Sequence, residues 1–267
     1  MATSRETNNP SPPGKATDWQ QVAGWYDALV GESGSEYHQK VILPGVLRLI
    51  KVEGATKVLD VACGQGVLCR ALAERGAEVT GVDAAPALIE SAIARGPASV
   101  RYLVGDARAL TALSAQSFDA AACVLAIQNI HPTLPVFEGV ARALKDRGRL
   151  VLVMMHPCFR GPKETSWGWD SARTIQYRRV DRYLVPRKEP IVTHPGSAPD
   201  AYTWSFHKPI EAYVKALRQA GLFIDALEEW PSHKTSTSGP RASAENMARK
   251  EIPMFLAIRA VKVEGLA

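Results

Sequence analysis

The stretch VLDVACGQGVLCRAL, from Val58 to Leu72, constrains the fold of this chain more than any other part of it. It begins as a short run of apolar and β-branched residues, typical of a buried strand, and ends with apolar residues at helical spacing. Gly64 and Gly66 lie between the two halves. Glycine is favoured where the backbone must turn sharply and approach a ligand closely. The stretch therefore predicts a strand, a tight turn and a helix, with the turn available for binding.

The same alternation of strands and helices continues along the chain. Seven apolar runs have the composition of buried strands, and they fall at 57–63, 77–83, 99–107, 118–127, 148–156, 223–230 and 253–263. Amphipathic patterns indicate helices at 66–75, 86–95, 135–145 and 209–221. Strands that alternate with helices of this length are joined by crossover connections, which need a parallel sheet covered on both faces. The prediction is an α/β fold with a mostly parallel seven-stranded sheet.

The alternation is interrupted after the fifth predicted strand. Residues 157–206 are polar, aromatic and proline-containing, and about fifty residues are too many for an ordinary loop. We expect an inserted substrate cap at 157–206 on a core formed by residues 19–156 and 207–262. Residues 1–18 lack the apolar segment of a signal peptide and have the composition of a disordered tail.

Composition narrows the class of protein. With 46% hydrophobic and 22% charged residues, the chain resembles an ordinary globular protein, and it has no apolar run of the ~20 residues that a membrane helix needs. Four cysteines without a CxxC pair suggest reduced thiols in a cytoplasmic protein. No His, Cys and Asp cluster has metal-ligand spacing. The net charge of +5 permits an anionic partner without requiring one, and nothing indicates the oligomeric state.

Two carboxylates distinguish between the ligands that such a glycine turn can bind. Asp83 ends the second predicted strand, where its carboxylate suits the ribose diol of a nicotinamide or an adenosyl ligand. A dinucleotide fingerprint needs a third glycine where this chain has Cys69. Asp60, four residues before Gly64, would also repel a pyrophosphate. S-adenosylmethionine carries a sulfonium and an ammonium but no phosphate, so the charges favour it.

These residues resemble a known family. LDVACGQG, followed by VTGVDAA, is similar to the D-x-x-x-G-x-G motif and second acid of the class I S-adenosylmethionine-dependent methyltransferases. The segments VGDA, FDAAACVLAIQNI and DRGRLVLVMMHP follow in that family's order. The likeness covers about 19–156 and 207–262 and is closest to the small-molecule branch that includes the ubiquinone and menaquinone methyltransferases. It implies a Rossmann-like fold, S-adenosylmethionine as cofactor and a small-molecule acceptor, first a phenol or hydroxyl oxygen, with nitrogen or carbon as alternatives.

The resemblance also implies which residues contact the cofactor. Gly64 and Gly66 would shape the turn beneath the methionine portion, and Asp83 would bind the ribose hydroxyls. Asp60 and the backbone of Cys63 would orient the ammonium. The other implied contacts are Tyr26 closing over the cofactor, Ala84 and Asp106 at the adenine, Ala107 through its amide, and Leu125 and Gln128 beside the reacting methyl.

The sequence indicates less directly which residues contact the methyl acceptor. His156 ends the fifth predicted strand and His131 follows the fourth, so either could remove a proton from the acceptor as the methyl transfers. A structural hydrogen-bonding role is the alternative for both histidines. Aromatic residues of the insert could form an acceptor pocket or a small core beneath the cap, and these are Trp167, Trp169, Tyr177 and Trp204.

Three other functions stay open. A nicotinamide-dependent oxidoreductase is disfavoured by Asp60 and by the missing third glycine. A nucleic-acid methyltransferase is suggested by the basic pI of about 9.0. Enzymes that methylate base amino groups carry an Asn/Asp-Pro-Pro-aromatic run after the fourth strand, where this chain has AIQNIHP, so nucleic acid is disfavoured as a partner. A cofactor-binding regulator without activity would share the same motifs.

Overall fold

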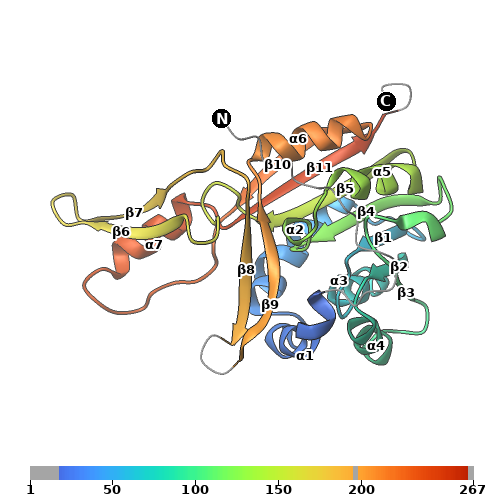
Figure 1. Ribbon diagram of the computed structural model, residues 1–267, viewed down its shortest axis with the longest axis horizontal. Helices are drawn as coiled ribbons and strands as arrows, with labels where there is room; N and C mark the ends of the chain where they lie inside the picture. Colours follow the sequence, from blue (N-terminus) through green and yellow to red (C-terminus); the bar gives the residue numbers. More distant parts are fainter. Residues whose placement is uncertain (1–17, 195–197, 264–267) are drawn as a thin grey trace, which may run out of the picture.

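The computed structural model describes residues 18–194 and 198–263 of the 267-residue chain. Almost all of the predicted tail, residues 1–17, lies outside the described residues. A central sheet is flanked by helices, and a narrower projection extends from one end of it (Figure 1).

The central sheet has seven strands in the order β10-β11-β5-β4-β1-β2-β3. They are β1 (Lys57–Val61), β2 (Glu78–Asp83), β3 (Arg101–Val104), β4 (Phe118–Val124), β5 (Leu144–Met155), β10 (Leu222–Trp230) and β11 (Phe255–Lys262). β11 runs antiparallel to β10 and β5, and the other six strands all run in one direction. The α/β fold with a mostly parallel seven-stranded sheet, predicted from the apolar runs, is confirmed.

Helices cover both faces of the sheet. Those expected from the sequence are α3 (Val67–Ala73), α4 (Pro86–Arg95), α5 (Leu134–Ala143) and α6 (Ile210–Gln219). The chain before β1 forms α1 (Asp18–Val30), the π-helical turn η1 (His38–Ile42) and α2 (Leu43–Ile50). Short 3-10 turns, η2 (Leu110–Ala112) and η3 (Ile127–Asn129), flank β4. One further helix, α7 (Ala242–Glu251), has no apolar stripe that could have predicted it, since Ala248 is its one buried residue.

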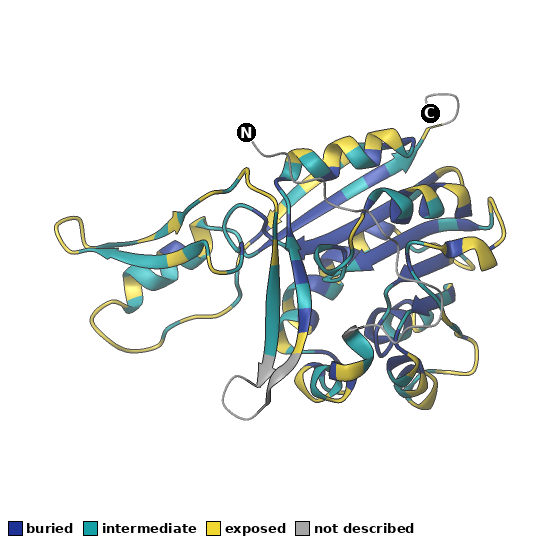
Figure 2. Cartoon of the chain, in the orientation of Figure 1, coloured by how far each residue is buried: buried dark blue, intermediate teal, exposed yellow. Residues whose placement is uncertain are grey.

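The strand β1 shows why a continuous apolar run folds into the middle of this sheet. Successive side chains of a strand point to opposite faces. Leu59 and Val61 pack in a core with α5 and α6, whereas Val58 packs in a second core with α2 and α3. The central strands are accordingly buried, and exposed residues lie on the outer faces of the helices (Figure 2).

The insert predicted at 157–206 consists of two antiparallel hairpins. The first pairs β6 (Thr165–Asp170) with β7 (Ile175–Val180), packs against α7 and forms the projection (Figure 1). The second pairs β8 (Arg187–His194) with β9 (Ala198–His207) and crosses the core so that β9 lies against α1 and η3. The two halves of the insert therefore have different neighbours.

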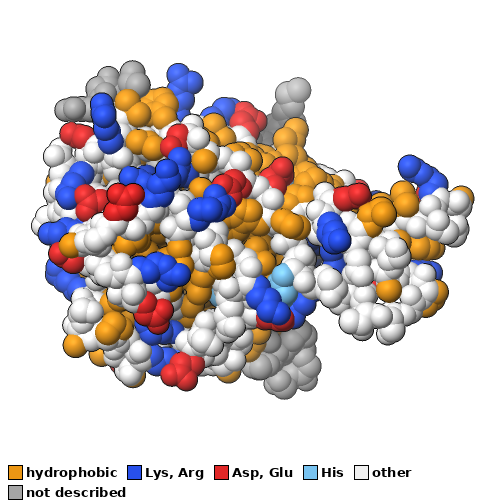
Figure 3. Space-filling view, turned by 180° about the vertical axis from the view of Figure 1, so that it is seen from behind, with side chains coloured by type: hydrophobic (Ala, Val, Ile, Leu, Met, Phe, Trp, Pro, Cys, Tyr) orange, Lys and Arg blue, Asp and Glu red, His pale blue; other side chains and the backbone are white. Residues whose placement is uncertain are grey.

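The rear face of the core carries side chains of both charges (Figure 3). Acidic and basic side chains are interspersed on the part of the rear face that the core forms (Figure 3). Among the residues that the structure describes, no helix has both the length and the apolar character needed to cross a membrane.

Candidate functional site

The chain turns sharply between β1 and α3. Ala62, Gly64 and Gly66 all have a positive φ there, of 56°, 54° and 80°. A Cβ atom on Gly66 would lie 2.6 Å from the hydroxyl of Tyr102, and one on Gly64 would lie 3.2 Å from the ring of Tyr26. The positive φ angles favour glycine at both positions, and a Cβ atom on Gly66 would also clash with Tyr102.

The carboxylates of Asp60 and Asp83 are buried beside this turn, with 2% and 8% of each residue exposed. Asp83 accepts hydrogen bonds from the backbone amides of Gly64 and Ala85, at 2.8 and 2.9 Å, which leaves its remaining lone pairs for a ligand. Asp60 accepts a hydrogen bond from the thiol of Cys69 at 3.2 Å. Within residues 18–194 and 198–263, neither carboxylate is paired with a cation. Such a pair of acids suits a ligand that brings positive charge.

Burial and, to a smaller extent, the nearby charge of Asp83 raise the pKa of Asp60 to about 7, against the hydrogen bond from Cys69, which lowers it. Burial also raises the pKa of the Asp83 carboxyl. The site is thus electrostatically unfavourable for the phosphates of a dinucleotide. The ammonium and sulfonium of S-adenosylmethionine would instead stabilise the ionised acids, so these residues fit that cofactor.

The raised pKa of Asp60 predicts a pH dependence of the ligand-free protein. Because the carboxyl binds its proton more tightly in the folded state, its stabilising contribution is present below the unfolded pKa of about 4. That contribution is lost as pH rises toward 7. Relative to Asp60→Asn, the wild-type free energy of unfolding should fall by about 2–4 kcal/mol between pH 4.5 and pH 8, measured by urea denaturation. Parallel pH profiles of the two proteins would contradict the raised pKa.

Helix α1 is held over the turn by a polar network that the sequence reasoning missed. Gln65, between the two glycines, donates to the carbonyl of Gly31 at 2.8 Å and accepts from Arg95. Arg95 also forms a two-pronged ion pair with Asp27 of α1, at 2.5 and 2.7 Å. These contacts fix Tyr26 against Gly64. The available signal was a long polar side chain between two glycines of a buried turn.

A second part of the site lies at the end of β4. Leu125 has a φ of 54° and accepts a hydrogen bond from the side-chain amide of Gln128 at 2.8 Å. The side-chain oxygen of Gln128 is buried and has no partner among the described residues. A buried, unpaired oxygen is costly unless a ligand donor reaches it. The predicted place of Gln128 beside the cofactor is compatible with this geometry.

Asp106, one of the residues predicted to contact the adenine, has other partners in the structure. Asp106 pairs with Arg108 at 2.6 Å and accepts the backbone amide of the same residue at 2.8 Å. Ala107 is buried and Ala84 is half-buried. The backbone amide of Cys63 donates to Val82 at 3.0 Å. The roles of these residues at an adenine or an ammonium stay predictions.

His156 is buried, with 1% of the residue exposed, and both ring nitrogens are engaged. Nδ1 accepts from the backbone amides of Cys158 and Phe159, at 3.2 and 3.4 Å. Nε2 therefore carries the proton and donates to Glu229 at 2.8 Å. Burial lowers the pKa of the ring. A base role would require one of these contacts to break, so the geometry favours a structural role.

We accordingly expect His156→Ala to act on stability. Loss of a buried ring with satisfied hydrogen bonds should lower the free energy of unfolding by about 2–3 kcal/mol, measured by urea denaturation. Single-turnover rates of the folded protein should stay within about threefold of wild type across pH 6 to 9. A loss of about 10²-fold or more, with the lower limb of the pH–rate profile removed, would restore the base role.

The remaining residues predicted to contact the acceptor are divided between the two hairpins. The guanidinium groups of Arg160 and Arg178 each lie 5.1 Å from the centroid of the Trp167 ring. Trp169 lies beneath Arg241 at 4.6 Å, and Tyr177 is 45% exposed. These three aromatic residues belong to the projection. Trp204 instead lies on β9, and its carbonyl accepts from Asn129 of η3 at 2.8 Å, while the exposed His131 stacks on Phe206 of β9. The structure therefore brings Trp204 and His131, but not the other three, next to the end of β4.

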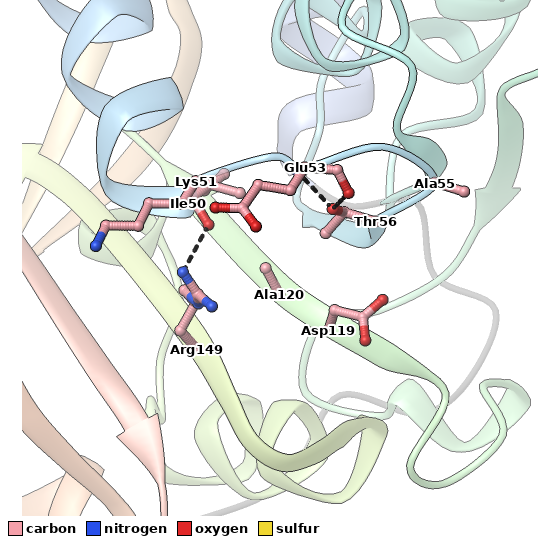
Figure 4. Close-up of a pocket in the computed structure, with 8 residues that line it drawn as sticks. All are labelled: Ile50, Lys51, Glu53, Ala55, Thr56, Asp119, Ala120 and Arg149. Atoms are coloured by element: carbon pink, nitrogen blue, oxygen red, sulfur yellow. Dashed lines mark hydrogen bonds between the residues drawn. The ribbon is translucent and has the colours of Figure 1, made fainter.

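A pocket of about 390 Å³ lies at the opposite edge of the sheet, between the end of α2 and the starts of β1 and β4 (Figure 4). Its polar groups are paired locally, since Arg149 donates to the carbonyl of Ile50 at 3.2 Å and Asp119 pairs with Lys145 at 2.6 Å. Open α/β sheets bind ligands at the carboxyl ends of their strands. The candidate site is thus the glycine turn and not this pocket. In the described part of the chain, no group of three or more His, Cys, Asp or Glu could hold a metal ion.

The part of the chain that contains the glycine turn also matches a known protein family. Residues 59–152, from β1 to β5, match a family described as Methyltransferase domain. A ubiquinone biosynthesis O-methyltransferase of Xylella fastidiosa is 34% identical over 132 residues, which are 48% of this chain and 53% of that protein. The protein of the same description from Xanthomonas campestris is 31% identical over 156 residues, or 54% and 65% of the two chains. The chain thus spans about half the length of the first curated relatives it matches.

One solved structure is similar over most of both chains. It is described as an S-adenosylmethionine dependent methyltransferase from Mesorhizobium loti, with 26% identity and a TM-score of 0.66. The alignment covers 82% of this chain and 96% of that one.

Proposed function

We propose that this chain is a class I S-adenosylmethionine-dependent methyltransferase, because residues 59–152 match a methyltransferase domain and the structure is similar to that of an S-adenosylmethionine dependent methyltransferase. It transfers the methyl group of S-adenosylmethionine to a small-molecule acceptor. A phenol or hydroxyl oxygen is the first choice of acceptor atom. The names of the curated relatives, ubiquinone biosynthesis O-methyltransferases, support an oxygen nucleophile.

The observation that carries this proposal is the pair of buried acids beside the glycine turn. Asp83 binds the ribose hydroxyls and Asp60 compensates the ammonium of the methionine portion. Tyr26 covers the ligand, since it already packs against Gly64. When bound, the cofactor supplies an electrophilic methyl group on a sulfonium. The protein contributes orientation of the acceptor and exclusion of water, which together account for much of the rate of such a displacement.

The first experiment is a binding comparison by isothermal titration calorimetry. The wild-type protein should bind S-adenosylhomocysteine and should not bind NAD. Asp60→Asn should weaken S-adenosylhomocysteine binding, because a neutral amide cannot compensate the ammonium. The reverse preference, for NAD, would replace the proposal with the nicotinamide-dependent alternative.

The second experiment tests catalysis. Phenols, catechols, amines and thiols are incubated with S-adenosylmethionine and the protein, and products are read by a mass increase of one methyl group. Methylation of oxygen acceptors is the expected result. A protein that binds S-adenosylhomocysteine but methylates no member of a broad panel would behave as a cofactor-binding regulator. Transfer to amines alone would change the acceptor atom and leave the reaction class intact.

A further inference from the structure

Three potentially cationic side chains surround one ring on the second hairpin. The Nζ atoms of Lys208 and Lys188 lie 5.7 and 5.8 Å from the centroid of Phe206. The ring of His131 stacks on Phe206 at a centroid distance of 5.2 Å. Lys188 also lies 3.8 Å from the centroid of Trp204. We call these five residues the lysine–aromatic cluster.

The register of the hairpin puts the strand members of this cluster on one face. Lys188 of β8 stands directly opposite Phe206 of β9, and Trp204 is two residues before Phe206. Side chains two residues apart on a strand share a face. The intervening Ser205 and His207 are buried on the other face, while Trp204 and Phe206 are half-buried. The cluster is therefore on the more accessible side of the hairpin.

The two lysines of the cluster have no ion pair with another described residue. The Lys208 ammonium has three donors, of which one reaches the carbonyl of Ile130 at 3.3 Å. In the part of the chain that the structure describes, no carboxylate forms an ion pair with Lys208 or Lys188. Burial lowers the pKa of Lys208 to about 8. The two ammonium groups near this ring repel each other, and burial of Lys208 disfavours its charged form. A bound anion would offset both the repulsion and the cost of burying this charge.

The cluster adjoins the end of β4, where the acceptor is expected. Lys208 donates to Ile130, and Asn129 donates to the carbonyl of Trp204. Asn129 and Ile130 directly follow Gln128, whose buried side-chain oxygen has no described hydrogen-bond partner. The loop that approaches the reacting methyl is thus bonded directly to the strand that carries the two aromatic rings.

We propose that Lys208, together with Lys188, binds the carboxylate of an aromatic methyl acceptor whose ring packs against Trp204. The inference rests on the proposed function and narrows its substrate class to an anionic phenol, such as a dihydroxybenzoate. Lys208 supplies the fixed charge, because it is the more buried ammonium, and the exposed Lys188 supplies a mobile one. Charge-assisted hydrogen bonds of this kind give both affinity and orientation.

The test compares 3,4-dihydroxybenzoate with catechol, which share the reacting hydroxyls and differ in the carboxylate. The wild-type kcat/KM should be about 10–100-fold higher for 3,4-dihydroxybenzoate. Lys208→Met should reduce this ratio to within about threefold of one, and Lys208→Arg should keep it. Lys215→Met is the matched control, because Lys215 is an exposed lysine of α6, and it should keep the wild-type ratio.

Calorimetry separates this inference from the proposed function. In the presence of S-adenosylhomocysteine, 3,4-dihydroxybenzoate should bind the wild type and the Lys215→Met variant at least tenfold more tightly than the Lys208→Met variant. That result supports the subsite even if neither compound is methylated. Absence of methylation would then contradict the oxygen acceptor of the proposed function and leave the subsite intact. Equal binding by both variants, or no binding to the wild type at millimolar concentration, overturns the subsite.

Discussion

Replacing Asp83 by asparagine should weaken the binding of S-adenosylhomocysteine by about 2–4 kcal/mol, measured by isothermal titration calorimetry. The carboxylate is proposed to accept both ribose hydroxyls, and it already accepts the amides of Gly64 and Ala85. An asparagine has one side-chain oxygen in place of two, and its amino group would face a backbone donor. The loss therefore combines a missing ligand contact with a loosened turn.

Asp119→Asn is the matched control for this substitution. Asp119 lies on β4 at the opposite edge of the sheet, where it pairs with Lys145 and accepts the amide of Lys57. Its replacement should leave the affinity for S-adenosylhomocysteine unchanged. An Asp83→Asn protein that binds as tightly as the control would show that the ribose contact lies elsewhere.

Much of the fold could be predicted because local patterns determine it. The inner strands β1, β2 and β4 of the parallel sheet are largely buried, so each is a recognisable apolar run such as KVLDV in β1. The spacing of Asp60, Gly64, Gly66 and Asp83 predicted that the four residues lie together at one edge of the sheet, because they belong to consecutive elements. The resemblance to the class I methyltransferases rested on the same residues, and it agrees with the methyltransferase domain matched at residues 59–152 and with the similar solved structure.

What could not be predicted depends on contacts between distant segments. Helix α7 is stabilised by packing on β7 and has no apolar periodicity of its own. The separation of Trp167 from Trp204 follows from the pairing of two independent hairpins, which the composition of the insert does not reveal. Lys208 and Phe206 are unremarkable in sequence, and their relation to Ile130 exists only after β9 has crossed the core.

Gly66→Ala should lower the free energy of unfolding by about 2–5 kcal/mol, measured by urea denaturation. The left-handed conformation, with a φ of 80°, costs an L-residue about 1–2 kcal/mol. The new Cβ would also lie 2.6 Å from the Tyr102 hydroxyl, which adds an overpacking cost of about 1–3 kcal/mol. Since Gly66 also begins α3, the binding of S-adenosylhomocysteine should weaken in parallel.

Two further variants distinguish the cost of the backbone conformation from the cost of steric crowding. Gly54 has a φ of 59°, and a Cβ atom on this residue would have no neighbour within 4 Å, so Gly54→Ala should show the conformational cost alone, about 1–2 kcal/mol. Tyr102→Phe removes a buried hydroxyl that has no described partner and should be neutral or slightly stabilising. In the Tyr102→Phe background, Gly66→Ala should therefore cost at least about 1 kcal/mol less than in the wild type. An unchanged cost would mean that the phenol moves aside freely, and that backbone conformation alone requires glycine at the turn beneath the cofactor.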